Sequence, residues 1–222
     1  DNEILMRAYS PGGASLITNN ETYNKVKLAF SGITDAGLNG FDQNDMTKIM
    51  AGKRVSAFPF ISGNYEGFSG RSVNSDVEDM FQLIYLNFTA INKDAEAYQA
   101  FVDKQVAFYG NLLNTPQYWF LNAKAKVAQV NNPRFTNAIP TAEEFGSQDY
   151  DLAYTLFKER FADAGDFTFI FIGSIDEDQI IEYSKKYLAS LPSTGKKESY
   201  VAHDYKHLSG RNEMVYNKGE DP

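Results

Sequence analysis

The residues that could perform chemistry in this chain are few. Its 222 residues include two histidines and no cysteine, which excludes disulfides, thiolate nucleophiles and cysteine-based zinc sites. His203 and His207 are spaced so that one helical face could carry both imidazoles and share a zinc ion. They follow a linker-like stretch and have no glutamate between them, so a solvated loop is the favoured interpretation.

Other catalytic patterns are equally weak. The sequence has no G-x-S-x-G elbow for a nucleophilic serine, no phosphate-binding loop and no G-x-G-x-x-G. Carboxylates are abundant, but the most prominent ones stand at expected helix starts, where capping and the helix dipole explain them. These are Asp42, Glu78, Asp94, Glu144 and Asp176.

The charge balance limits the partners. A net charge of −8 argues against a nucleic-acid binder, which needs a basic surface. The longest apolar run, Phe167 to Ile172, is far too short to span a membrane as a helix. Positions 104–142 contain no acidic residue, and a buried helix pair is the favoured explanation. The alternative is a wall that meets an acidic or extended peptide, with Lys124, Lys126 and Arg134 as candidate substrate-binding residues.

The elements that would position these residues follow from turn signals and apolar periodicity. Strands are expected over residues 4–9, 54–62, 65–73 and 167–172, and helices over 20–30 and from about 42, 75, 94, 115, 150 and 176. The helix after Asp42 is expected to bury Met46, Ile49 and Met50.

Two of the strands carry further information. Pro59 cannot donate to a ladder, so the strand at 54–62 is expected at a sheet edge or a bulge. The uninterrupted apolar run Phe167 to Ile172 predicts a central strand covered on both faces. Strands and helices that are segregated along the chain predict an α+β fold with a mostly antiparallel sheet. We expect one domain over residues 1–192, then a linker and the start of a following domain over 193–222.

Several local sequences stand in an order typical of one family. They are RAYSPGGASL at 7–16, GKRVS at 52–56, YEGFSG at 65–70, the segment 161–176, LASLP at 188–192 and NKG at 217–219. Together they resemble a non-catalytic domain from the second half of a bacterial pitrilysin/insulinase-type zinc peptidase.

The segment 23–32 resembles the metal-binding helix of this family without its ligands. Aligned on its closing Phe30-Ser31-Gly32, the inverted H-x-x-E-H positions fall at Tyr23, Val26 and Lys27. A phenol is a poor zinc ligand, an ammonium group repels the ion, and valine accepts no proton. The third ligand of the family belongs to the region that lacks acidic residues. We therefore expect no catalytic residue and no bound metal in this chain.

The resemblance also implies a fold and a role. The fold is an α+β domain with helices on one face of the sheet, as in pitrilysin and mitochondrial processing peptidase. The role is a chamber-forming, peptide-binding domain of a zinc metalloendopeptidase, in which the catalytic half of the same polypeptide holds the zinc and performs proteolysis. A periplasmic or otherwise extracytoplasmic location follows only by analogy with the family.

Two alternatives stay open. The first is a processing-peptidase-like scaffold or assembly subunit without proteolytic activity. The second is an independent binding module for peptides or glycans, which the abundance of Tyr and Phe suggests.

Overall fold

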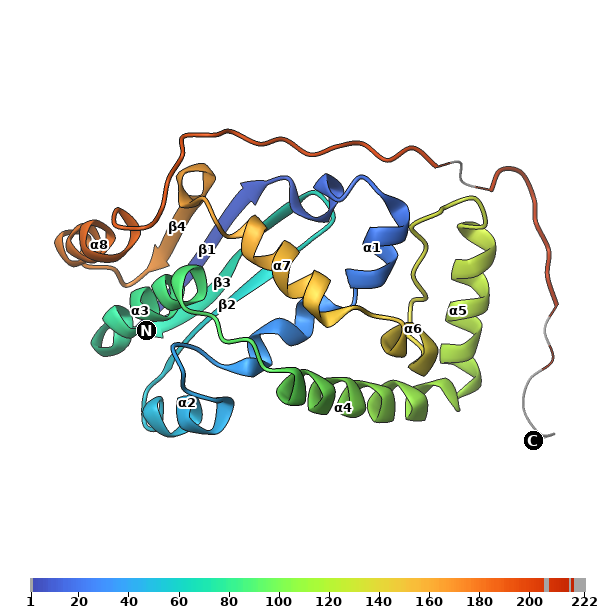
Figure 1. Ribbon diagram of the computed structural model, residues 1–222, viewed down its shortest axis with the longest axis horizontal. Coiled ribbons are helices and arrows are strands. Elements are labelled where there is room, and N and C mark those ends of the chain that lie inside the picture. The colour runs from blue at the N-terminus through green and yellow to red at the C-terminus, as the bar shows by residue number, and fades with distance from the viewer. Residues whose placement is uncertain (1, 206–207, 216, 218–222) are drawn as a thin grey trace.

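The computed structural model describes residues 2–205, 208–215 and 217. His207 and the residues at 218–219 of the expected lead-in to a following domain lie outside this part. The strands form one antiparallel sheet in the order β2-β3-β1-β4 (Figure 1). Their bounds are β1 Glu3–Pro11, β2 Val55–Ile61, β3 Tyr65–Val73 and β4 Thr168–Gly173.

The helices separate and follow these strands. They are α1 Asn20–Val26, α2 Gln43–Ile49, α3 Val77–Thr89, α4 Ala95–Leu113, α5 Pro116–Ala128, α6 Ala142–Gly146, α7 Tyr150–Arg160 and α8 Glu177–Tyr183. Short 3-10 turns lie at Gly13–Leu16, Ala29–Ala36, Asn74–Asp76 and Ala164–Asp166, and a π-helical turn lies at Ser184–Leu188. The helix that was expected over 20–30 therefore ends at Val26 and continues as a 3-10 helix.

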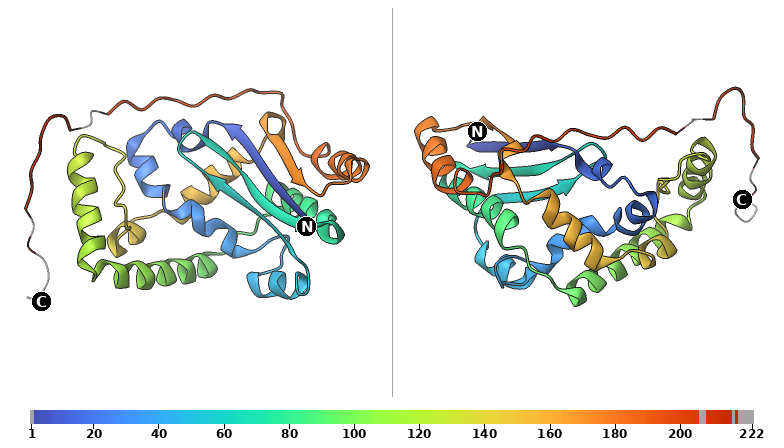
Figure 2. Two further views of the ribbon diagram at one scale, coloured as in Figure 1. Left: turned by 180° about the vertical axis from the view of Figure 1, so that it is seen from behind. Right: turned by 45° about the horizontal axis from the view of Figure 1, so that its top comes forward.

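One face of the sheet is covered by helices and the other is open, as the view from behind shows (Figure 2). Strand β1 makes the division clear, because its side chains alternate between the two faces. Ile4 and Met6 are each 1% exposed on the covered side, whereas Leu5 and Tyr9 are 49% and 44% exposed on the other. The expected α+β fold with helices on one face of an antiparallel sheet is confirmed.

The expectation that residues 167–172 form a central strand is wrong. Among the described residues, β4 pairs with β1 alone and forms an edge of the sheet. Phe171 faces the helices and stacks on Phe81 with ring centroids 5.1 Å apart. Ile170 and Ile172 point to the open face. Residues 167–172 are therefore all apolar or β-branched because alternate side chains contribute to the core and to the apolar open face.

The other edge behaves as the sequence predicts. β2 lies at the far side of the sheet, and Ser62 N–H donates to the Tyr65 carbonyl across the tight turn to β3. From that pair, the register directs the backbone groups of Phe58 and Phe60 toward β3 and those of Pro59 away from it. Pro59 therefore removes no ladder hydrogen bond.

Two burial expectations fail. Ile49 of α2 is 44% exposed, and Met46 and Met50 are only partly buried, because α2 covers a margin of the core. No residue of α5 is buried, and Phe120 on it is 52% exposed. A buried helix pair therefore does not explain the region without acidic residues, because α5 extends beyond the core as an arm (Figure 1).

Candidate functional site

The degenerate motif lies on α1, a helix that begins where Asn19 accepts a hydrogen bond from Thr22 N–H. Val26 is fully buried in the core. Tyr23 and Lys27 stand one helical turn apart, toward the segment that follows α5. The position that the resemblance aligns with a catalytic glutamate thus contributes to core packing in this chain.

Two positive side chains, Lys27 and Arg134, lie at or beside the positions that the resemblance aligns with zinc ligands. The guanidinium of Arg134 lies 3.6 Å from the ring centroid of Tyr23, and the ammonium of Lys27 donates to the Phe135 carbonyl. Lys27 also donates to Asn24 Oδ1 at 3.0 Å. Burial lowers the pKa of Lys27, Glu144 opposes this shift, and the charge of Arg134 adds to it.

The guanidinium of Arg134 connects the segment between α5 and α6 to residues near the start of the chain. Its Nη1 donates to the Ile17 carbonyl at 2.7 Å and its Nη2 to the Ala14 carbonyl at 2.8 Å. These contacts and the stacking on Tyr23 hold a residue that is distant in sequence against α1. Tyr23, Lys27 and Arg134, which were singled out for different reasons, therefore meet in one cluster.

This cluster does not fit a zinc ion. Zinc requires deprotonated nitrogen, sulfur or oxygen donors, and here the motif positions hold a cation, a buried valine and a phenol under a guanidinium. Across the described ranges, no group of three or more His, Cys, Asp or Glu side chains could hold a metal ion. No chemical step through a metal can be derived from these residues.

The other two candidate cations lie elsewhere. Lys126 lines a hollow of about 860 Å³ beside α5 with Trp119, and Lys124 lines a neighbouring hollow of about 420 Å³ with Phe120. The structure does not bring them to Arg134.

The sheet offers a second candidate site at the edge of β4. Ser174 N–H donates to the Glu3 carbonyl, and from that pair the register turns the backbone groups of Phe169 and Phe171 outward. In the described part of the chain, neither outward N–H has a hydrogen-bond partner. A sheet edge with unpaired backbone N–H and C=O groups can form hydrogen bonds with another strand. The sequence did not reveal this edge, because the apolar run resembled a central strand.

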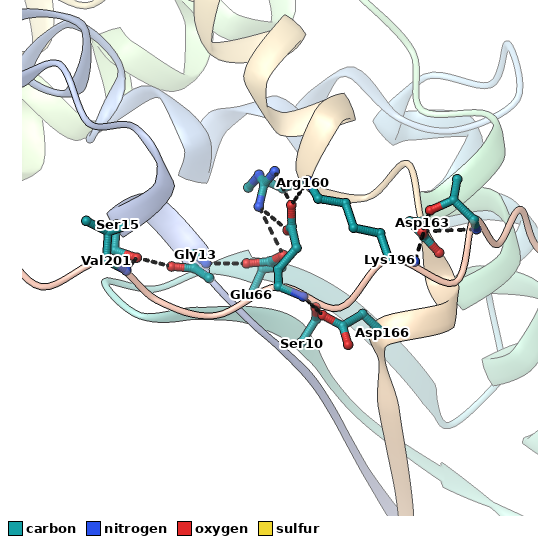
Figure 3. A network of polar contacts seen from close by, with 12 residues as sticks. Ser10, Gly13, Ser15, Glu66, Arg160, Asp163, Asp166, Lys196 and Val201 are labelled. Atoms are coloured by element: carbon teal, nitrogen blue, oxygen red, sulfur yellow. Dashed lines mark hydrogen bonds and ion pairs between the residues drawn. The ribbon is translucent and has the colours of Figure 1, made fainter.

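A buried carboxyl lies on the covered side of the sheet (Figure 3). Glu66 is 1% exposed, accepts from Gly13 N–H at 2.5 Å and lies 3.7 Å from Arg160 Nη1. Burial raises its pKa to about 7, although the Gly13 N–H and the charge of Arg160 oppose the shift. Ser10 lies directly opposite Glu66 in the register, but its hydroxyl donates to Asp166 at 3.5 Å. The contacts of Glu66 are those of a structural anchor.

The segment after Pro192 is held along the domain by the same network (Figure 3). Thr194 N–H donates to Asp163 at 3.0 Å, and Glu198 N–H donates to Asp166 at 2.8 Å. Arg160 pairs with the carboxylate of Glu198 at 2.6 Å.

The polar contacts continue beyond Glu198. Val201 N–H donates to Ser15 Oγ at 2.9 Å, and His203 Nε2 lies 2.7 Å from the carbonyl of Ser15. His203 therefore has a local contact. No helix in the described part is both long and apolar enough to cross a membrane.

Comparison with known proteins gives one curated sequence relative and many similar folds. No family model matches the chain. The probable zinc protease PqqL of Haemophilus influenzae is 21% identical over 200 residues, which are 90% of this chain and 21% of that protein. The chain therefore spans about a fifth of the length of its curated relative.

The structural similarities agree with this match. The periplasmic protease PqqL from Escherichia coli superposes with a TM-score of 0.70 at 16% identity, over 94% of this chain and 22% of that one. A peptidase M16 inactive domain from Pseudomonas fluorescens gives a TM-score of 0.67 at 15% identity, over 90% of this chain and 47% of that one. The chain therefore has the fold of a pitrilysin-type peptidase domain, and its sequence is similar to that of a probable zinc protease.

Proposed function

We propose that this chain is a non-catalytic, chamber-forming domain that binds extended peptide for a zinc metallopeptidase. The zinc and the catalytic residues belong to another half of the same polypeptide, and the protein works outside the cytoplasm. The zinc-protease name of the relative and the periplasmic location of the E. coli neighbour support this proposal.

The observation that carries peptide binding is the open edge of β4. Its outward N–H groups at Phe169 and Phe171 have no partner in the described part of the chain. Main-chain pairing at such an edge accepts many sequences, which suits a domain that must hold varied polypeptides. The opposite edge is less suitable, because Pro59 offers no donor at the middle of β2.

Hydrogen exchange at single residues tests the proposal. A mixture of unstructured peptides, added in excess to the 222-residue chain, should slow exchange of the Phe169 and Phe171 amides. The outward amide of Ala57 on β2 is the matched control, and its exchange should not change. Peptides N-methylated at every second residue on the pairing side should lose the effect, because they cannot donate to β4.

Two results would contradict the proposal. The first is unchanged exchange at β4 when peptide is present at saturating concentration, which would favour the scaffold or assembly role. The second is one tightly held zinc ion per chain in metal analysis, which would instead favour a catalytic role for this chain.

A further inference from the structure

The open face of the sheet carries two arginines among apolar side chains. Arg7 on β1 and Arg71 on β3 are both exposed, and neither has an ion pair, hydrogen bond or aromatic partner in the described part of the chain. This is unusual in a chain with a net charge of −8, where acidic partners are plentiful. Glu3, at the start of β1, lies on the same face.

The register brings the two arginines close together. Arg71 lies directly opposite Leu5, and Arg7 follows Leu5 by two residues on the same face. The two arginines are therefore diagonal neighbours, with Cα atoms about 7–8 Å apart. Side chains as long as arginine can converge on one carboxylate from that separation.

Apolar residues flank the arginines along both directions of the sheet. Phe58 and Ile172, at 62% and 63% exposed, stand on either side of a hollow of about 610 Å³ that both arginines line. Arg7 also lines a second hollow of about 730 Å³, toward the end of β1, with Tyr9 and Tyr65. Arg7 thus lies between a hollow with mixed aliphatic and aromatic lining and a hollow lined by two tyrosines.

We infer that this face binds an extended peptide segment in which a carboxylate side chain stands between apolar or aromatic residues. The inference rests on the proposed binding of peptides and adds a second contact surface, the open face beside β4, with a preference for acidic sequences. An extended peptide that runs along the strands repeats its side chains with the same spacing as β1. The preferred pattern is therefore an Asp or Glu with an apolar residue two positions before it and an aromatic residue two positions after it, or the reverse.

Peptide pairs test the preference directly. One nine-residue probe has Glu at its centre with Ile and Phe two positions away on either side, and its partner has Gln at the centre. We expect the Glu peptide to bind the full chain about fivefold more tightly at low salt, with the difference shrinking as salt rises. Arg7→Gln combined with Arg71→Gln should abolish the difference and keep the affinity for the Gln peptide.

Lys158→Gln is the control for loss of positive charge elsewhere, because it removes one charge from an exposed site on α7, on the covered side, and compares with Arg7→Gln or Arg71→Gln alone. It should leave the Glu preference intact. Thermal unfolding of the arginine variants should match that of the parent chain, which excludes misfolding as the cause. The side-chain Nε–H signals of Arg7 and Arg71 should shift with the Glu peptide and not with the Gln peptide.

The outcomes separate the two proposals. Equal binding of both peptides, together with slowed exchange at β4, would overturn the acidic preference and leave peptide binding standing. Absence of binding together with unchanged exchange at β4 would overturn both. A dimer that forms with increasing concentration and is broken by Phe58→Lys would show that a second copy covers this face, and would overturn the inference.

Discussion

The two faces of the sheet use similar residues for different purposes. On the covered face, Phe81 is fully buried, stacks on Phe171 and lies 5.7 Å from the ring of Tyr183. On the open face, Phe58 and Ile172 are more than 60% exposed. The contrast shows that the fold completes its core on one side and leaves an apolar surface on the other.

The polar residues follow the same division. On the covered side, Arg134 donates to two carbonyls and Arg160 contacts Glu66 and Glu198. On the open side, Arg7 and Arg71 have no such partners in the described part of the chain. Contiguous apolar surface is uncommon on a monomer unless it serves an interaction, so the open face has the composition of a contact surface.

The largest effect is expected from removing matched phenylalanines. Phe81→Ala should lower the free energy of unfolding by about 3–5 kcal/mol, because it leaves a cavity in a packed aromatic cluster. Phe58→Ala should cost less than about 1 kcal/mol, because solvent already reaches most of its ring. Urea unfolding followed by circular dichroism measures both. Similar losses would mean that the open face is buried in solution and would break the comparison.

The sequence predicted the two neighbouring strands β2 and β3, the mostly antiparallel sheet, and an edge or a bulge at β2, because each depends on local signals. Gly63-Asn64 and the proline at 59 are such signals. The position of β4 could not be predicted in the same way. Phe171 packs in the core and Ile172 lies on the open face. An apolar run alone does not distinguish such an edge strand from a central strand that is covered on both faces.

The candidate site shows the same limit. Residue types alone predict that Tyr23, Val26 and Lys27 would be unsuitable for zinc, because ligand chemistry depends on the side chain. The stacking of Arg134 on Tyr23 was not predictable, since it joins residues that are far apart in sequence. The unpaired state of Arg7 likewise becomes visible only when the sheet order is known.

Matched arginines sharpen the comparison at an intermediate magnitude. Arg134→Gln should cost about 1–3 kcal/mol of unfolding free energy, because two partly buried hydrogen bonds to carbonyls and the stacking on Tyr23 are lost. Arg7→Gln should change stability by less than about 0.5 kcal/mol. Thermal and urea unfolding of the two variants would test this difference. A loss in Arg7→Gln as large as that in Arg134→Gln would show that Arg7 has a structural partner.

The last comparison concerns two carboxyls and appears as a pH dependence, which is small over each single pH unit. The pKa of Glu66 is raised from 4.5 to about 7 because the group is buried, so the folded chain retains a proton that the unfolded chain loses earlier. The stability from this group is fully present below pH 4.5 and is lost as the pH rises through 7, by roughly 1 kcal/mol per pH unit. Glu66→Gln should remove that fall, since the amide stays neutral and its oxygen can still accept from Gly13 N–H.

Glu3→Gln, at an exposed position of the open face, is the control for this experiment, and the fall with pH should remain in it. Urea unfolding at intervals between pH 4.5 and 8 measures both profiles. If Glu66→Gln kept the same profile as the parent chain, the covered side would not bury a titrating carboxyl. Only the arginines would then support the conclusion that, within the described residues, the covered side pairs its charged groups and the open side leaves them unpaired.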